Sequence, residues 1–178
     1  IIPPSGPTSP AGPSAGGPVT PVPEVTPTQP KYTYSDVTPS HWAYTAIEDL
    51  TKRGIVDGND DGTFGPNNNI TREAFVKMLV TAMDSEVMWY ETPFKDVSED
   101  AWYYNFVATA VNAGIVNGIE DDFFGVGYNI TRQDICVLIH RAFFAGDTAK
   151  DADCNDFGEV SDYAKTAVSV MYDKGILQ

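Results

Sequence analysis

Basic residues are scarce in this sequence, and their scarcity excludes a first class of partner. The 178 residues contain 11 lysines and arginines against 25 aspartates and glutamates, so the net charge is −14 at neutral pH. Nucleic-acid binding needs a basic stripe that neutralises phosphates, and docking on an anionic membrane needs a similar patch. We therefore expect no nucleic-acid partner. An acidic surface suits a soluble, secreted protein.

Cysteine and long apolar runs are also scarce. Cys136 and Cys154 are the two cysteines, and their spacing fits no zinc site, so we expect no metal and no cofactor. Cys136 falls on the apolar side of an expected helix and Cys154 in a polar loop. Two separate thiols are the simpler interpretation, and a disulfide stays open. No apolar run approaches the roughly 20 residues of a membrane helix, and we expect no membrane insertion.

Residues suited to catalysis form no recognisable set. His41 and His140 have no nucleophile at a familiar spacing. Carboxylates are numerous, but no pair recurs in a cleft-forming motif. We therefore expect no catalytic residue and no enzyme activity in this chain.

Residues 1–33 differ in composition from everything after them. They are dominated by Pro, Gly, Ser, Thr and Val, with Glu24 as the single acid. Proline favours extended backbone, and so few large apolar groups cannot offset the entropy of folding. The segment is predicted to be a disordered, semi-stiff linker. We expect the chain to be a piece of a longer protein, with this linker leading from a preceding part.

One pattern occurs twice after the linker, with a constant offset of 60 residues. Its elements are a Gly-Ile-Val-x-Gly stretch, a Phe-Gly pair and an Asn-Ile-Thr-Arg stretch, found at 54–58, 64–65 and 69–72 and again at 114–118, 124–125 and 129–132. Such agreement without a gap indicates an internal repeat. A third start is visible before the chain ends, where Tyr163 stands in the place of Trp42 and Trp102. The predicted division is linker 1–33, then repeats 34–92, 93–152 and a truncated 153–178.

Each repeat predicts a helix, a loop and a second helix. The helices are expected at 41–52, 71–83, 101–112 and 131–143, with another from about 163 to Gly175. Ser40 is a plausible cap for the first, and glycines such as Gly54 stop the helices. Helical spacing predicts these apolar residues to face inward: Trp42, Ala46, Ile47, Leu50, Phe75, Leu79, Met83, Trp102, Phe106, Val107, Val111, Ile135, Leu138, Ile139, Phe143, Ala167, Val168 and Met171. The fold class is mainly α, built from tandem helix-loop-helix repeats.

These motifs resemble the S-layer homology (SLH) module of secreted bacterial proteins, over residues 34–178. The matching features are Asp36, His41-Trp42-Ala43, Gly54-Ile55-Val56-x-Gly58, Asp61-Gly62-Thr63-Phe64 and Ile70-Thr71-Arg72, then Phe94-x-Asp96, Trp102, Gly114-Ile115-Val116-x-Gly118, Phe124 and Ile130-Thr131-Arg132. The family often continues Ile-Thr-Arg with Ala-Glu. Here the first copy continues with Glu73-Ala74 and the second with Gln133-Asp134, which puts any role of that acid in doubt.

The resemblance implies a fold, a location and a ligand. Three such modules pack as a pseudo-threefold, mainly helical unit at the bacterial cell wall, outside the cell. Grooves between modules hold a secondary cell wall polysaccharide without a covalent bond. The usual ligand carries a pyruvate ketal on N-acetylmannosamine. The expected function is anchoring of a secreted protein to the cell wall.

Arg72 and Arg132 are the first candidates for contacting such a ligand, because an arginine can hold a carboxylate through two parallel hydrogen bonds. Each lies in the first turn of an expected helix, where free N–H groups and the helix dipole also favour an anion. The alternative is an internal ion pair with a neighbouring acid. We expect Arg72→Ala to weaken binding of wall polymer and barely change the melting temperature. A large loss of stability with unchanged binding would mean that the arginine is structural.

The other candidate ligand-binding residues each have a structural alternative. The tryptophans could stack on a sugar or be buried in the core. The aspartates could bind sugar hydroxyls or cap the following turn. Helix capping is the simplest role of the threonines. The set is Asp36, Trp42, Thr71, Asp96, Trp102, Thr131 and Tyr163. Each groove is predicted to combine the Thr-Arg helix start of one repeat with the Asp/Trp segment of a neighbour, and Tyr163 is expected to give the second groove a different affinity.

Two further hypotheses concern calcium and self-association. Asp57-x-Asn59-x-Asp61-Gly62 has the opening of an EF-hand loop, but Asn68 stands where a bidentate Glu belongs. A calcium-binding docking module is therefore one alternative. The other is a structural module that assembles with copies of itself in a surface layer.

Overall fold

The computed structural model describes residues 34–177, and this part of the chain is helical. It contains α1 (Tyr44–Lys52), α2 (Arg72–Ala82), α3 (Tyr104–Asn112), α4 (Arg132–Phe143) and α5 (Lys165–Asp173), with a short 3-10 turn, η1 (Phe157–Glu159). Between residues 34 and 177 there is no β-strand, only isolated bridges such as Thr71 with Asn129. The mainly α fold class is confirmed. The predicted linker lies outside the described residues.

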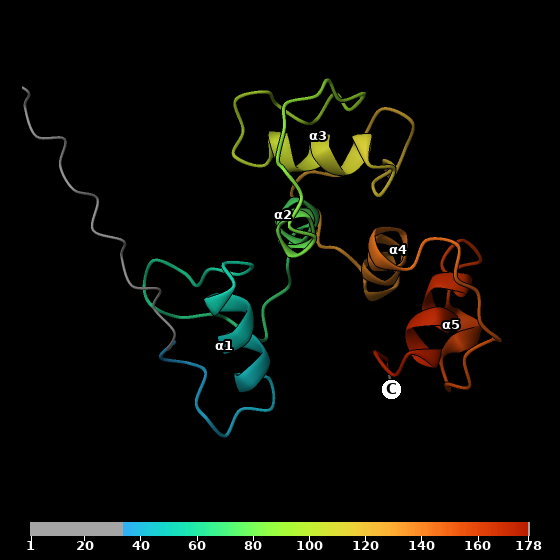
Figure 1. The fold of residues 1–178 in the computed structure, drawn as a ribbon, viewed down its shortest axis with the longest axis horizontal. Coiled ribbons are helices and arrows are strands. Elements are labelled where there is room, and N and C mark those ends of the chain that lie inside the picture. Colours follow the sequence, from blue (N-terminus) through green and yellow to red (C-terminus); the bar gives the residue numbers. More distant parts are fainter. Residues whose placement is uncertain (1–33, 178) are drawn as a thin grey trace, which may run out of the picture.

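The second helix of each repeat packs against the first helix of the next repeat. α2 contacts α3, α4 contacts α5, and α2 also contacts α4. Figure 1 shows α2 and α4 nearly end-on near the middle, with α1, α3 and α5 placed around them. The sequence repeats therefore interlock along the chain, and each interface between repeats is built from a central and an outer helix.

The helices α1 and α3 begin three residues later than predicted. Tyr44 N–H donates to the His41 carbonyl and Tyr104 N–H to the Ala101 carbonyl, so a tight turn precedes each helix. Trp42 sits in the first of these turns, outside the helical register that predicted its burial. It is 90% exposed, and its counterpart Trp102 is 59% exposed. Of the two alternatives left open for these tryptophans, core burial is therefore wrong.

Ser40 does not cap α1. Its hydroxyl lies 2.9 Å from the Thr38 hydroxyl, and no side chain caps the helix start. The helix ends, by contrast, follow the prediction. Gly54 adopts φ 67°, its N–H donates to Thr51, and Ile55 N–H donates to Leu50. A left-handed residue at this position closes the last turn, and glycine adopts it without a Cβ penalty.

The main hydrophobic core crosses the repeat boundaries. Val76 from α2, Val107 from α3 and Leu138 from α4 meet around Phe124, which is fully buried. Burying a side chain of this kind contributes about 1.5–3 kcal/mol. A second cluster joins α4 to α5 through Cys136 and Met171. The core therefore fixes how neighbouring repeats sit against each other.

Several predicted core positions differ from the structure. Ile47, Leu79, Val107, Leu138, Ala167, Val168 and Met171 are buried, as predicted. Ala46 and Phe143 are exposed. Phe143 ends α4, and the next residue, Phe144, packs against the α4–α5 cluster instead. The remaining positions of the predicted inward set, apart from the two tryptophans, are half-buried.

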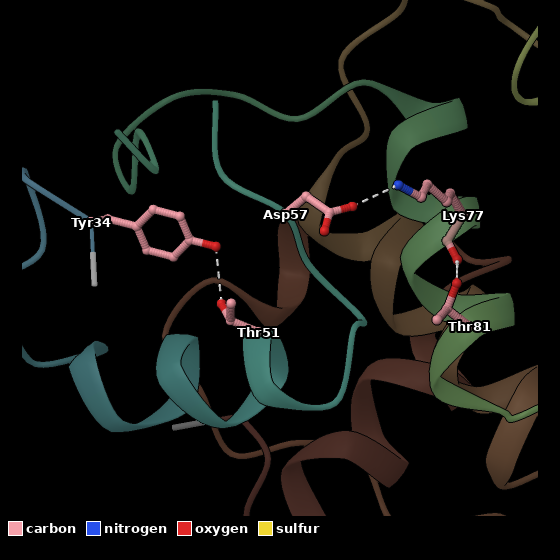
Figure 2. Close-up of polar contacts among 5 residues, drawn as sticks. All are labelled: Tyr34, Thr51, Asp57, Lys77 and Thr81. Carbon is pink, nitrogen blue, oxygen red and sulfur yellow. Dashed lines mark hydrogen bonds and ion pairs between the residues drawn. The ribbon is translucent and has the colours of Figure 1, made fainter. Parts of the chain in front are cut away.

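The first repeat has its own small cluster and a polar link to α2. The ring centres of Tyr34 and Phe64 lie 5.3 Å apart, and the Tyr34 hydroxyl lies 3.1 Å from the Thr51 hydroxyl. Lys77 on α2 donates to Asp57 at 3.0 Å. Figure 2 shows the contact of Tyr34 with Thr51 and that of Lys77 with Asp57, together with the bond from the Thr81 hydroxyl to the Lys77 carbonyl. The loop after α1 is thereby held beside α2.

Candidate functional site

Two grooves lie at equivalent positions of the repeat. The first groove, about 640 Å³, is lined by α2 and the loop before it, with Trp102 reaching in from the second repeat. The second groove, about 310 Å³, is lined by α4 and the loop before it, with Tyr163 reaching in from the segment just before α5. The equivalent wall residues, 60 positions apart, are Asp57 and Asn117, Asn59 and Ile119, Ala74 and Asp134, Lys77 and Val137, and Met78 and Leu138. The repeat therefore forms the same kind of groove twice.

Arg72 lines the second groove, although it belongs to the first repeat. Its side chain is only 7% exposed, its Nη2 donates to the Asn117 carbonyl at 3.0 Å, and its guanidinium carbon lies 5.1 Å from the centre of the Phe124 ring. The buried Nε has no hydrogen-bond partner, and among residues 34–177 no carboxylate forms an ion pair with Arg72. Burial lowers the pKa of Arg72, while the charge of Asp134 opposes this.

The opposite wall of the second groove is a hydrogen-bonded set centred on Tyr163. Its ring is 61% exposed, and its hydroxyl donates to Asp134 at 2.8 Å and accepts from Gln133 at 3.0 Å. Burial and the bond to Asp134 raise the pKa of Tyr163, while Gln133 and Arg72 act against this. Arg141 completes the lining and donates to the Ile115 carbonyl at 3.1 Å. The groove thus combines two guanidinium groups, one carboxylate and one phenol.

Arg132 has a different environment from Arg72, its equivalent. It is exposed and lines a third cavity, of about 230 Å³, between α4 and α5. Within the described part of the chain its side chain forms no ion pair. The structure therefore places neither arginine in an internal ion pair, and it brings each to the wall of a different cavity.

The two threonines precede α2 and α4 as predicted, but they differ in detail. Thr131 accepts from Asp134 N–H at 3.2 Å and donates to the Asp134 carboxylate at 2.7 Å. Thr71 makes no such capping bond and lines the first groove. Arg72 N–H donates to the Tyr128 carbonyl. The expectation of a free N–H for an anion is therefore wrong at this position of α2.

The two aspartates hold loops. Asp36 accepts backbone N–H bonds from Phe64 at 2.7 Å and Gly65 at 2.8 Å, and these bonds lower its pKa. Asp96 accepts three such bonds, from residues 124–126, at 2.8–2.9 Å. Burial would raise the pKa of Asp96, but the three donors outweigh it and the pKa is lowered. Neither aspartate lines either groove, and neither does Trp42, which stacks on His41 instead.

Sequence reasoning missed the role of the residue after each arginine. Glu73 is buried and accepts from Gly127 N–H at 3.0 Å, so it joins α2 to the loop of the second repeat. Gln133, its equivalent, accepts from Ser161 N–H at 3.0 Å and joins α4 to the segment that leads to α5. The signal was present in the repeat, because an acceptor side chain follows the arginine in both copies.

The acidic loop of the calcium hypothesis uses its ligands internally. Asp61 accepts from the backbone and the hydroxyl of Thr63, and Asn59 donates to the same hydroxyl. Between residues 34 and 177 no three His, Cys, Asp or Glu side chains are grouped to hold a metal ion. In the same range, no helix is both long and apolar enough to cross a membrane.

The fold and the grooves define a class of protein, a tandem-repeat helical module with grooves between its repeats. Comparison with known families identifies the repeat. The S-layer homology domain matches residues 33–76 and 93–136, and the chain belongs to this family. Domains of this family mediate anchoring at the cell surface.

The relatives include surface proteins and enzymes. An endoglucanase of Bacillus sp. (strain KSM-635) is 30% identical over 79% of this chain and 15% of its own length. The Surface-layer 125 kDa protein of Lysinibacillus sphaericus is 27% identical over 78% of this chain and 12% of its own length. The Cellulosome-anchoring protein of Acetivibrio thermocellus is 30% identical over 64% of this chain and 26% of its own length.

This chain thus spans about a quarter or less of the length of these relatives. The endoglucanase shares with it only a small part of its sequence, so the likeness does not extend to the enzyme as a whole. Family membership and the surface-layer relative support an extracellular location at the bacterial cell surface.

Proposed function

We propose that this chain anchors the protein that carries it to the bacterial cell wall by binding an acidic, pyruvylated secondary cell wall polysaccharide in the grooves between its repeats. The observation that carries the proposal is Arg72. It is a nearly buried cation on the wall of the second groove, with no carboxylate partner in the described chain and an unpartnered Nε.

A buried cation is costly unless an anion or several acceptors compensate it. The Asn117 carbonyl supplies one acceptor to Arg72, at 3.0 Å. A carboxylate entering the groove would supply a charge and two acceptor oxygens, which match the forked geometry of guanidinium. Arg141 lines the same groove and adds a second positive charge. The local potential there favours an anion even though the net charge of the chain is −14.

The remaining wall suits a sugar. The exposed ring of Tyr163 offers an apolar face for a pyranose, and the carboxylate of Asp134 can accept hydrogen bonds from sugar hydroxyls. The ligand would then meet an arginine from the first repeat, a helix from the second and an aromatic ring from the third. Proposed contact residues are Arg72, Asp134, Arg141 and Tyr163, with Thr71 and Trp102 in the first groove.

The two grooves are proposed to differ in affinity. In the first groove, Lys77 is already paired with Asp57 at 3.0 Å, as Figure 2 shows. In the second groove, Asn117 and Val137 replace this pair and Arg72 is added. An incoming carboxylate would compete with Asp57 in the first groove but meet no such competitor for Arg72. We therefore propose that the second groove is the stronger site. The proposed boundaries of the three repeats are 34–92, 93–152 and 153–178.

A second candidate function is assembly in a surface layer. The relative from Lysinibacillus sphaericus is named a surface-layer protein, and Val87, Met88 and Trp89 form an exposed apolar run between the first two repeats. Exposed apolar patches often mark protein interfaces. No catalytic role is proposed for this chain.

Co-sedimentation with purified cell wall tests the proposal. We expect the chain to pellet with intact wall and to stay in the supernatant after the pyruvate groups have been removed. Equal pelleting with both preparations would rule out recognition of the carboxylate. Pelleting without any wall would favour self-assembly instead.

A further inference from the structure

Both cysteines of the chain lie on the wall of one cavity, between α4 and α5. Cys136 is a buried residue of α4, and Cys154 is a half-buried residue of the loop that leads to α5. The chain has only these two cysteines, so only one intramolecular pairing exists. We propose that Cys136 and Cys154 form a disulfide that ties this loop to α4, a modification that is independent of polysaccharide binding.

The loop is held against the helices on both sides of Cys154. Before it, the Asp153 carbonyl accepts from the Tyr172 hydroxyl of α5 at 3.0 Å. After it, the Cys154 carbonyl accepts from Phe157 N–H at 3.2 Å, and Phe157 packs against the cluster that contains Cys136. A thiol anchored in this way samples little space, so the effective concentration of one sulfur near the other is high. The cavity of about 230 Å³ that both side chains line leaves room for either thiol to change its rotamer.

The two thiols differ in their access to an oxidant. Cys136 is only 4% exposed, whereas Cys154 also lines an open cavity formed with Asp156 and Tyr172. An oxidant from solution therefore reaches Cys154 first. Burial raises the pKa of both thiols. Asp156 raises that of Cys154 further, while the charge of Arg132 partly opposes the rise at Cys136.

The reaction needs an oxidant, and we assign this role to a small-molecule disulfide. The Cys154 thiolate attacks the small disulfide, forms a mixed disulfide and releases one small thiolate. The Cys136 thiolate then attacks the Cys154 sulfur, forms the protein disulfide and releases the second small thiolate. The two cysteines lose two protons and two electrons, and the electrons reduce the small disulfide to two thiols. Extracellular proteins meet conditions in which such bonds persist.

The bond would stiffen the link between the second and third repeats. It closes a loop from Cys136 to Cys154, and cross-links of that size restrict the unfolded chain appreciably. The segment after Cys154 runs on to Ser161, whose N–H is bound by Gln133 one turn before Cys136 on α4. The covalent and the hydrogen-bonded links would therefore lie side by side.

The test uses the 178-residue chain, reduced and then incubated with oxidised glutathione, a small disulfide. Thiols are blocked by alkylation after denaturation, and protease fragments are analysed by mass spectrometry. We expect one linked pair of fragments containing Cys136 and Cys154, lighter by two hydrogens than the reduced pair. Because both thiols are largely protonated at neutral pH, the linked form is expected to accumulate faster as the pH is raised. The melting temperature of the oxidised chain should exceed that of the reduced chain by on the order of 5 °C.

Cys154→Ser is the control, because a half-buried thiol tolerates this change better than the buried Cys136. It should abolish the linked pair and the difference in melting temperature between oxidised and reduced samples. Two outcomes would overturn the proposal. One is a stable glutathione adduct on Cys154 with Cys136 still free, and the other is a dimer of chains linked through Cys154.

Discussion

Replacing Arg72 tests whether the cation on the wall of the second groove serves binding, stability or both. Sequence reasoning predicted that Arg72→Ala barely changes the melting temperature. That prediction conflicts with the burial of this side chain and with its contacts to Asn117 and Phe124. The structure instead predicts a loss of stability together with a loss of binding.

The magnitude follows from the contacts of Arg72. A hydrogen bond to a charged group contributes about 1.5–3 kcal/mol, and the guanidinium over the Phe124 ring about 0.5–2 kcal/mol. Removing a buried cation with an unpartnered Nε offsets part of this loss. We therefore expect Arg72→Ala to lower the free energy of unfolding by about 1–3 kcal/mol, which corresponds to a fall of several degrees in melting temperature.

Arg72→Met separates the two roles. Methionine keeps an apolar chain in the same space, so it should retain most of the packing while it loses the charge. Removing one partner of a buried charge pair typically costs about 2–5 kcal/mol of binding, so we expect at least a tenfold loss of affinity for wall polymer.

Arg53→Ala is the matched control for charge. Arg53 follows α1 on the surface, where it pairs weakly with Asp49 at 3.8 Å, and it lines neither groove. Replacing Arg53 changes the net charge by the same amount as replacing Arg72. It should leave both the affinity for wall polymer and the melting temperature nearly unchanged. Thermal melting and co-sedimentation of the three variants decide the question. Wild-type affinity in a folded Arg72→Met chain would refute the argument.

Three further predictions concern the groove wall and the loops. Tyr163→Phe keeps the ring but removes the hydroxyl bound to Asp134 and Gln133, so binding should weaken by about three- to tenfold with little change in melting temperature. Asp96→Ala should destabilise the chain by roughly 2–4 kcal/mol, measured by urea unfolding, because three backbone N–H groups lose their acceptor. Folding lowers the pKa of Asp96, so its contribution to the free energy of unfolding is present at neutral pH and is lost as the pH falls below about 4 towards the folded pKa. The wild-type chain should therefore lose more stability in acid than Asp96→Ala does, and an equal loss in both would contradict this. Gly114→Ala should lower the free energy of unfolding by about 1 kcal/mol, because φ is 71° at this position. Gly158→Ala should lower it less, because Gly158 has open space around it and no positive φ.

The helices and their ends could be read from the repeat because local rules govern them. Gly54, Gly114 and Gly175 end helices with positive φ, and Thr71 and Thr131 precede helices. These features depend on a few neighbouring residues, so two copies of one pattern predict two copies of one structure. The mainly α fold followed from them.

The burial of particular side chains could not be read in the same way. Trp42 and Trp102 have helical spacing, but a turn before each helix takes them out of its register. Arg72 and Arg132 have the same place in the repeat. Arg72 is covered by Asn117 and Phe124 of the second repeat, while Arg132 remains exposed. Exposure of this kind depends on which repeat packs next to which, and a local pattern carries no such information.

Binding of a defined ligand to the purified chain is the most direct test of the central claim. Calorimetric titration would compare wall polysaccharide fragments that carry the pyruvate group with the same fragments after its removal. We predict measurable binding of the pyruvylated fragment and a loss of at least tenfold in affinity without the carboxylate. Equal affinity for the two fragments would contradict the role assigned to the second groove and its arginine.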